Sequence, residues 1–507
     1  MSGTRAVFGG LGLLLALTLA VAQRSPAVWD DRSWYDETYV FLEGMGIAYL
    51  EPWPGQFVRS NLDLSPGLGR VLHNLAHHDA YPPLVDLMVW SLRTTPHPLL
   101  ALRGVFVALG LVLIAVAYRY GGRLIGTAGA ACLALYLACS PMLTATGQEL
   151  KWYAVAPLLA MLATVMLLQL ERGRALRWSL YALTVFLLLN LHYFCLWLLP
   201  AHALFVWRFR PELRRPFAVA LAAIVLALAP WAAWGLPRQL PYLRWHFETF
   251  LASLPYNSWY QPSTPRSLAG SWLYTFLAAI GWQPSPLRAR YLLPVAGLAG
   301  WLLFRAARSA DRVRREMALV SLATFGIALV GLTLYSMRLG QTTPLTSTYF
   351  TPWCPLLMVS LMIGVFEMER AGTRWSLAVL FVGGAAVNLV FLGPPRRTLD
   401  PDPLSHYVPL ARALSEPSLA SSAIVFRYDR DAKMVNTFYE GPARQMIFAP
   451  GAARDVPAEV TDLVFVSSAE APVTAALPGW TRPQVERVLG HARIETARRV
   501  PAAAGSP

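Results

Sequence analysis

The segment ERGRALRWSLYALTVFLLLNLHYFCLWLLPAHALFVWRFRPELRR, residues 171–215, places an apolar stretch between two arginine-rich turns. Arginine clusters in short loops mark the cytoplasmic side of a membrane protein. The chain must therefore leave that side and return within the 30 residues from Trp178 to Trp207. Each arm of this hairpin reaches only about 22 Å, less than a hydrocarbon core. We expect its tip, NLHYF (190–194), to stop below the outer surface and to line a cavity.

The composition places this hairpin in a polytopic membrane protein. Hydrophobic residues make up 55% of the 507 residues and charged residues 14%, and apolar segments occupy most of the chain up to about residue 392. The net charge of +14 is carried mainly by arginine, because Lys151 and Lys433 are the only lysines. Nucleic acid is a poor explanation for this charge, because the arginines cluster between apolar spans, as orientation signals do.

Five basic turns fix the inside, and the apolar runs predict an all-α membrane bundle of about 11 transmembrane helices, N-terminus in and C-terminus out. The turns are RYGGR (119–123), ERGRALR (171–177), RFRPELRR (208–215), RAARSADRVRRE (305–316) and ERAGTR (369–374). The spans lie near 6–22, 99–118, 124–141, 152–170, 176–190, 193–207, 217–235, 290–305, 317–335, 349–366 and 375–392. The first span ends in LTLAVAQ, which is also compatible with signal-peptidase cleavage, and we prefer an uncleaved span.

Three regions are expected outside. Residues 23–98 form a long first loop, and residues 236–289, rich in proline and aromatic residues, form a lid on the membrane interface. Within the lid, 267–282 is expected to be an interfacial helix, because a crossing there would put the basic segment 305–316 outside. Residues 1–393 then form the membrane module. A helix, LSHYVPLARALSE, and the strands SAIVFRY and DLVFVSS predict a soluble extracytoplasmic α/β domain over 394–507.

The first loop carries two groups of ionisable residues. In WYDETYV (34–40), a helical backbone would point Glu37 about 100° away from Asp36, so the two carboxylates cannot do the same job. One can accept a proton from an attacking hydroxyl, and the other can hold a cation or orient the loop; the alternative is that both are solvated charges on an interfacial helix.

At the far end of the loop, HHDAYPPLVDLMVW (77–90) joins Asp79 and Tyr81 to a rigid double-proline turn. The adjacent histidines lack a third ligand at helical spacing, so we assign no metal site there.

Two further groups lie at the membrane edge. SPMLTATGQELKWY (140–153) places Glu149 and Lys151 where an ionisable residue is costly, which indicates function. Lys151 can receive a phosphate, although snorkelling from a helix end is the alternative. At the hairpin tip, His192 and Tyr193 either face the cavity or pack in the core.

Taken in order, these elements resemble the GT-C membrane glycosyltransferases, in particular the family 39 group of protein O-mannosyltransferases and lipid A aminoarabinose transferases. An Asp-Glu pair in the first external loop is similar to YDETYV, and a D-x-H-P-P-L turn to DAYPPL. An S-P followed by Q-E-x-R/K-x-Y is similar to SPMLTATGQELKWY, T-H-Y-F to NLHYF, and R-Y-x-x-P-x-x-P to TYFTPWCP. The resemblance runs from the first span to about residue 366.

The resemblance implies transfer of one sugar from a polyprenyl-phosphate donor to a lipid, glycan or protein hydroxyl on the external face, with inversion. It implies Asp36 as the general base with Glu37 beside it, and a substrate-binding role for Asp79, Tyr81, Glu149, Lys151, Tyr153, His192 and Tyr193. Lys151, with Arg338 or a divalent cation, would stabilise the departing phosphate. Tyr81 replaces the usual histidine of the proline turn. Thr348 stands where the family often has arginine before Tyr349, which leaves the phosphate contact there open, and no metal ligand set is assigned.

A transporter or flippase of lipid-linked sugars is the main alternative, with the carboxylates as coupling sites. The sequence shows no inverted repeat or paired broken helices, and the acidic residues lie in an external loop. A non-catalytic envelope scaffold would leave the intramembrane Glu149 and Lys151 unexplained.

Overall fold

The computed structural model describes residues 2–28, 40–41, 44–45, 67–78, 81–147, 150–171, 174–244, 261–282, 290–391, 407–426, 435, 444–447, 459–468, 480–489 and 492–500. The chain divides into two compact units. The first contains Met1–Trp29, Leu75–Val85 and Leu100–Arg396, and the second contains Asp30–Asn74, Asp86–Leu99 and Arg397–Pro507.

The first unit is a bundle of membrane-type helices, as the hydropathy pattern predicts. Its long helices are α1 (Ser2–Val28), α5 (Pro98–Ala138), α7 (Trp152–Gln169), α8 (Ala175–Leu189), α9 (Leu198–Phe209), α10 (Arg214–Arg244), α12 (Pro265–Ala279), α13 (Leu293–Ala307), α14 (Arg312–Leu339), α15 (Cys354–Phe366) and α16 (Ala371–Phe391). Its short helices are α6 (Pro141–Thr146) and the 3-10 turns η1 (Tyr193–Trp197), η2 (Pro211–Leu213), η5 (Thr343–Leu345) and η6 (Ser347–Trp353). Helices α3 (Leu68–His78) and α4 (Leu84–Leu92) each contain residues of both units. Among the described residues, 6 helical stretches are long and apolar enough to cross a membrane, and shorter apolar helices accompany them.

Burial separates the central helices from the peripheral ones. The apolar windows of α7 and of η6 with α15 are 78% and 89% buried, whereas those of α10 and α16 are only 17% and 22% buried. Helices α7 and α15 therefore form the centre of the bundle, and α10 and α16 present apolar faces of the kind that contact lipid. Glycine permits the closest approach at the centre, because a Cβ on Gly364 of α15 would lie 2.2 Å from the backbone oxygen of Leu302 in α13.

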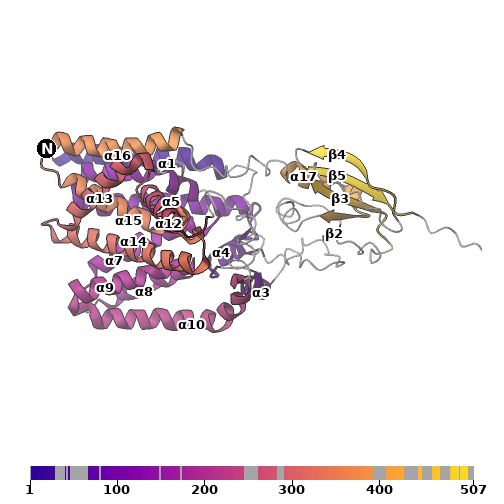
Figure 1. Cartoon of the computed structure of the whole chain (residues 1–507), viewed down its shortest axis with the longest axis horizontal. Coiled ribbons are helices and arrows are strands. Elements are labelled where there is room, and N and C mark those ends of the chain that lie inside the picture. The colour runs from indigo at the N-terminus through magenta and orange to yellow at the C-terminus, as the bar shows by residue number, and fades with distance from the viewer. Residues whose placement is uncertain are drawn as a thin grey trace, which may run out of the picture. The chain divides into compact units, whose positions relative to one another are not determined.

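The predicted hairpin is formed by α8, η1 and α9. Helix α8 packs against both α7 and α10 (Figure 1). A buried polar chain joins three helices: the hydroxyl of Tyr181 lies 2.9 Å from Nδ1 of His202, whose Nε2 lies 3.3 Å from the hydroxyl of Thr164. Both ring nitrogens of His202 therefore have hydrogen-bond partners inside the apolar bundle. This network fixes how the hairpin stands against α7.

Two helix boundaries differ from the sequence expectation. Helical structure continues through residues 119–123, and the break between the two parts of α5 falls at Gly126, whose φ of 73° and ψ of 171° are open to glycine. Helix α10 continues to Arg244 despite Pro237 and Pro241, so the first part of the expected lid, 236–244, is helical. Helix α12 agrees with the helix expected over 267–282; residues 245–260 and 283–289 lie outside the described residues.

The described part of the second unit contains a five-stranded sheet of order β2-β1-β3-β5-β4. Its strands are β1 (Ser422–Phe426), β2 (Arg444–Ile447), β3 (Asp462–Ser468), β4 (Gln484–Leu489) and β5 (Ala492–Arg498), preceded by α17 (Tyr407–Leu414) and η7 (Pro417–Leu419). Strand β1 is parallel to β2 and β3, whereas β5 is antiparallel to β3 and β4. The predicted helix and strands therefore correspond to α17, β1 and β3. The other strands were not predicted.

The break in α5 gives the first prediction. Replacing Gly126 with alanine introduces no steric contact, because no atom lies within 4 Å of the added Cβ. Its φ is nevertheless unfavourable for any residue with a side chain, so we expect Gly126→Ala to lower the free energy of unfolding by about 1–3 kcal/mol. Gly122→Ala, in helical backbone with equally open space, is the control. Equal thermal midpoints for the two variants in detergent micelles would contradict this account.

Candidate active site

The hairpin tip is built around His192. Helix α8 ends at Leu189, and His192 takes an extended conformation with φ of −162° and ψ of 140° that begins η1. Its Nδ1 accepts a hydrogen bond of 3.0 Å from the backbone N–H of Phe194. An imidazole that accepts at Nδ1 is neutral and carries its proton on Nε2. The ring is therefore a hydrogen-bond donor, held in one tautomer and only 5% exposed.

Aromatic side chains from four separate segments surround this imidazole. The ring centroid of Trp152, at the start of α7, stacks at 4.1 Å, and that of Tyr81 lies at 5.2 Å. The centroids of Phe194 and of Tyr349 in η6 lie at 4.8 and 5.5 Å. Four segments thus meet at one point: the proline-turn motif, the start of α7, the hairpin tip and the TYFTPW segment. We call His192 and the side chains around it, those of Tyr81, Lys151, Trp152, Phe194 and Tyr349, the His192 cluster.

Lys151 supplies the positive charge of this cluster. It is the N-cap of α7 and is only 3% exposed. Its Nζ lies 5.4 Å from the ring centroid of Tyr81 and 5.5 Å from that of Tyr153. Burial of the imidazole, and then the charge of Lys151, lower the pKa of His192 well below its ordinary value of 6.5. The cluster therefore pairs a buried cation with a neutral imidazole at neutral pH.

Tyr193 points to a different partner, Gln239 of α10. The Tyr193 hydroxyl donates to Oε1 of Gln239 and accepts a hydrogen bond of 3.2 Å from Nε1 of Trp231. Nε2 of Gln239 donates to the backbone oxygens of Leu75, at 2.7 Å, and Tyr81, at 2.9 Å. One fully buried amide thus ties the hairpin tip to the segment that carries Tyr81. Gln239 is a positioning residue for the cluster.

The remaining predicted residues fall into two groups. Asp36, Glu37, Asp79 and Glu149 lie outside the described residues. Arg338 is exposed near the end of α14, one turn after Tyr335, whose ring centroid lies 6.0 Å from that of Phe194. No group of three or more histidine, cysteine, aspartate or glutamate residues that could hold a metal occurs among the residues that the structure describes.

Trp152 and Gln239 were not predicted from the sequence as site residues. Trp152 is fully buried, and its indole nitrogen has no hydrogen-bond partner in the described part of the chain, so it is a donor available to a ligand. Its position directly after Lys151 was a usable signal. Gln239 also had a signal, because it is an uncharged amide between two prolines, Pro237 and Pro241, in a largely apolar helix.

No family model matches the chain, and no curated protein matches it in sequence. Among solved structures, ArnT from Cupriavidus metallidurans bound to undecaprenyl phosphate matches with a TM-score of 0.56 and 13% identity over 98% of this chain and 99% of ArnT. Its apo state gives 0.55 and 12%, with 98% of each chain covered. The archaeal oligosaccharyltransferase AglB from Archaeoglobus fulgidus, in complex with an inhibitory peptide and a dolichol-phosphate, gives 0.49 and 12% over 90% of this chain and 69% of AglB. The fold is thus the GT-C membrane fold that the order of motifs predicts.

The neutral state of His192 predicts a pH dependence of stability. Because its pKa is lower in the folded than in the unfolded chain, the unfolded state binds a proton first as the pH falls below 6.5. The contribution of the neutral imidazole to the free energy of unfolding is therefore complete above pH 6.5. Below that pH it falls by about 1.4 kcal/mol per pH unit. We expect His192→Gln to reduce the difference in thermal stability between pH 7.5 and 5.5.

His97→Gln, which changes an exposed histidine, is the matched control and should keep the wild-type difference. An unchanged pH dependence in the His192 variant would show that this imidazole does not carry the effect.

Proposed function

We propose that the protein is a membrane glycosyltransferase that moves one sugar from a polyprenyl-phosphate donor to an acceptor hydroxyl on the extracytoplasmic face, with inversion at the anomeric carbon. The observation that carries the proposal is the convergence of Lys151, Trp152 and His192 at the N-terminus of α7, within a chain that shares its fold with ArnT over almost its whole length. ArnT binds undecaprenyl phosphate, a lipid of the proposed donor class.

The His192 cluster is suited to a phosphate. The N-terminus of an α-helix has unpaired N–H groups and a partial positive charge, both of which favour an anion. At the start of α7 the Lys151 ammonium adds a full charge, and burial strengthens its attraction for an anion. A phosphate leaving group needs this stabilisation as its negative charge grows.

The neutral imidazole adds a directional hydrogen bond to the attraction by the Lys151 charge. A donor on Nε2 of His192 can hydrogen-bond a phosphate oxygen or a sugar hydroxyl without exchanging its proton near neutral pH. Trp152 stacks on the imidazole, and the half-buried ring of Tyr349 beside it offers a flat apolar face. Such faces suit the C–H surface of a sugar and exclude the water that would hydrolyse the donor.

The proposed reaction is a single displacement. The acceptor oxygen forms a bond to the anomeric carbon while the bond from that carbon to the phosphate oxygen breaks. The carboxylate of Asp36 accepts the hydroxyl proton, with Glu37 beside it, and the electron pair of the broken bond stays on polyprenyl phosphate. Asp79, Tyr81, Glu149 and Tyr153 are assigned to substrate binding, and Arg338 to the same phosphate.

Three further assignments belong to this proposal. The segment 236–289 covers the site as a lid, and the domain at 394–507 lies on the extracytoplasmic side, where it meets a lipid, glycan or protein acceptor. A divalent cation remains a proposed aid to the phosphate. No step is routed through it, because the acidic residues that would hold it lie outside the described residues.

The test is sugar transfer by the purified full-length protein from radiolabelled polyprenyl-phosphate sugars to a membrane extract. We expect Lys151→Met to lower kcat at least about 100-fold, because an uncompensated phosphate charge raises the barrier. Asp36→Asn should be similarly impaired, since an amide cannot accept the proton. Lys433→Met, at the only other lysine, should retain activity.

Two results would contradict the proposal. Equal labelling by Asp36→Asn and wild type would remove Asp36 from the mechanism, and equal labelling by Lys151→Met would remove the phosphate role. Labelled sugar that crosses the bilayer of reconstituted vesicles without transfer to any acceptor would instead identify a transporter.

A further inference from the structure

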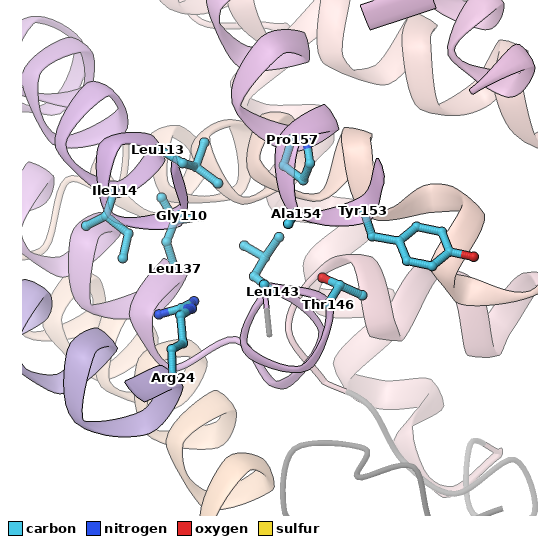
Figure 2. A pocket seen from close by; sticks show the side chains of 11 residues that line it. Arg24, Gly110, Leu113, Ile114, Leu137, Leu143, Thr146, Tyr153, Ala154 and Pro157 are labelled. Atoms are coloured by element: carbon cyan, nitrogen blue, oxygen red, sulfur yellow. The ribbon is translucent and has the colours of Figure 1, made fainter. Parts of the chain in front are cut away.

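A cavity lies beside the first turns of α7, where Ala154 and Pro157 line it. It is a small space, lined by residues of α1, α5, α6 and α7 and by Gly147 after α6. Its walls are largely apolar. Figure 2 shows Arg24 reaching from α1 into the space between Gly110, Leu137 and Leu143, while the ring of Tyr153 points away from it.

Arg24 is a buried cation without a matching anion in the described part of the chain. Its side chain is 2% exposed, and its Nε has no hydrogen-bond partner there. Its one described hydrogen bond, from Nη1 to the backbone oxygen of Ala20, is 3.5 Å long, which is at the limit for such a bond. A buried guanidinium is costly unless an anion or hydrogen-bond acceptors compensate its charge.

The backbone around Arg24 leaves room for its guanidinium. A Cβ on Gly147 would lie 3.2 Å from Nε, and a Cβ on Gly110 would lie 3.8 Å from the same atom. Two glycines from different parts of the bundle therefore flank the charged group. Thr146 also lines the cavity, and its hydroxyl is bonded to the backbone oxygen of Met142 at 2.7 Å. The guanidinium is thus the polar group that remains available to a ligand in this cavity.

We propose that this cavity binds the phosphate group of a lipid, with Arg24 as its counter-ion. The planar guanidinium matches a phosphate with two parallel hydrogen bonds. Leu113, Ile114 and Leu137 provide walls that suit the first carbons of a lipid chain and would be poorly covered by a soluble anion. The space is small, so it accepts at most a phosphate head group and not a whole lipid.

The site is separate from the one proposed for the donor. Tyr153 contributes to the wall of the cavity, but its ring lies against Lys151. The same lipid phosphate can come from a membrane phospholipid or from a polyprenyl phosphate. The inference does not depend on the proposed transfer reaction, because it concerns a second cation and requires no turnover.

The test is native mass spectrometry of the purified, delipidated full-length protein. The ligands are phosphatidylglycerol and undecaprenyl phosphate, with diacylglycerol, polyprenol and inorganic phosphate as controls. We expect wild type to retain at least one of the two lipid phosphates and none of the controls at the same concentration. Arg24→Met should weaken that retention at least about tenfold, and Arg24→Lys should weaken it less, because lysine keeps the charge but loses the paired geometry.

Lys151→Met separates the two sites. If Arg24→Met loses phosphatidylglycerol and Lys151→Met keeps it, the cavity is assigned to a phospholipid. The same pattern with undecaprenyl phosphate assigns it to a polyprenyl phosphate. Equal retention of both lipids by wild type, Arg24→Met and Arg24→Lys would overturn the proposal, as would equal retention of diacylglycerol and phosphatidylglycerol.

The thermal midpoint of the delipidated protein tests a purely structural role. If Arg24 awaits a ligand, Arg24→Met should be at least as stable as wild type without lipid, since it removes an uncompensated charge, and only wild type should gain stability when the lipid is added. Two results together would show that Arg24 serves the fold alone. Without lipid, Arg24→Met would be less stable than wild type, and wild type would gain no stability when lipid is added. Failure here leaves the proposed transferase activity untouched, because that activity is measured at Lys151 and Asp36.

Discussion

A chain that reverses direction inside a helical bundle must satisfy its polar groups without bulk water. At the tip of the α8–α9 hairpin this is achieved locally: His192 accepts from Phe194, and the carbonyl of Asn190 accepts from the N–H of Leu84 at 3.0 Å. Because these bonds are made at the point of reversal, they also fix the segments that meet there. The same bonds that make the short hairpin stable therefore create the His192 cluster.

Buried cations are used in two different ways in this protein. Lys151 lies at a helix N-terminus among aromatic rings, whereas Arg24 lies against glycines in an apolar cavity. In the basic turns at 208–215 and 305–316, arginines make ion pairs, as in the 2.7 Å contacts that Glu316 makes with Arg210 and Arg312. Such ion pairs fix the turns, whereas for Lys151 and Arg24 we have proposed an anion that a ligand supplies.

The sequence predicts most of the bundle because apolar runs and basic turns obey a simple physical rule about charge and lipid. It places the break in α5 at the RYGGR turn, which is wrong by a few residues, because a helix tolerates Gly121 and Gly122 and ends only where Gly126 adopts positive φ. The family resemblance assigns Lys151, Tyr81, His192 and Tyr349 to substrate binding, and the structure brings these four side chains together. Gln239 and Arg24 were not predicted, because their importance lies in which backbone atoms and cavities they reach, and this depends on packing between segments far apart in the sequence.

The amide of Gln239 has a mechanical consequence. It belongs to α10, the least buried of the long apolar helices, yet it holds the carbonyl of Tyr81 and the hydroxyl of Tyr193. A helix that faces lipid tilts as the thickness of the bilayer changes. Any such tilt pulls on Gln239 and so on the segment that carries Tyr81. The geometry around His192 is therefore coupled to the hydrophobic thickness of the membrane in which the protein resides.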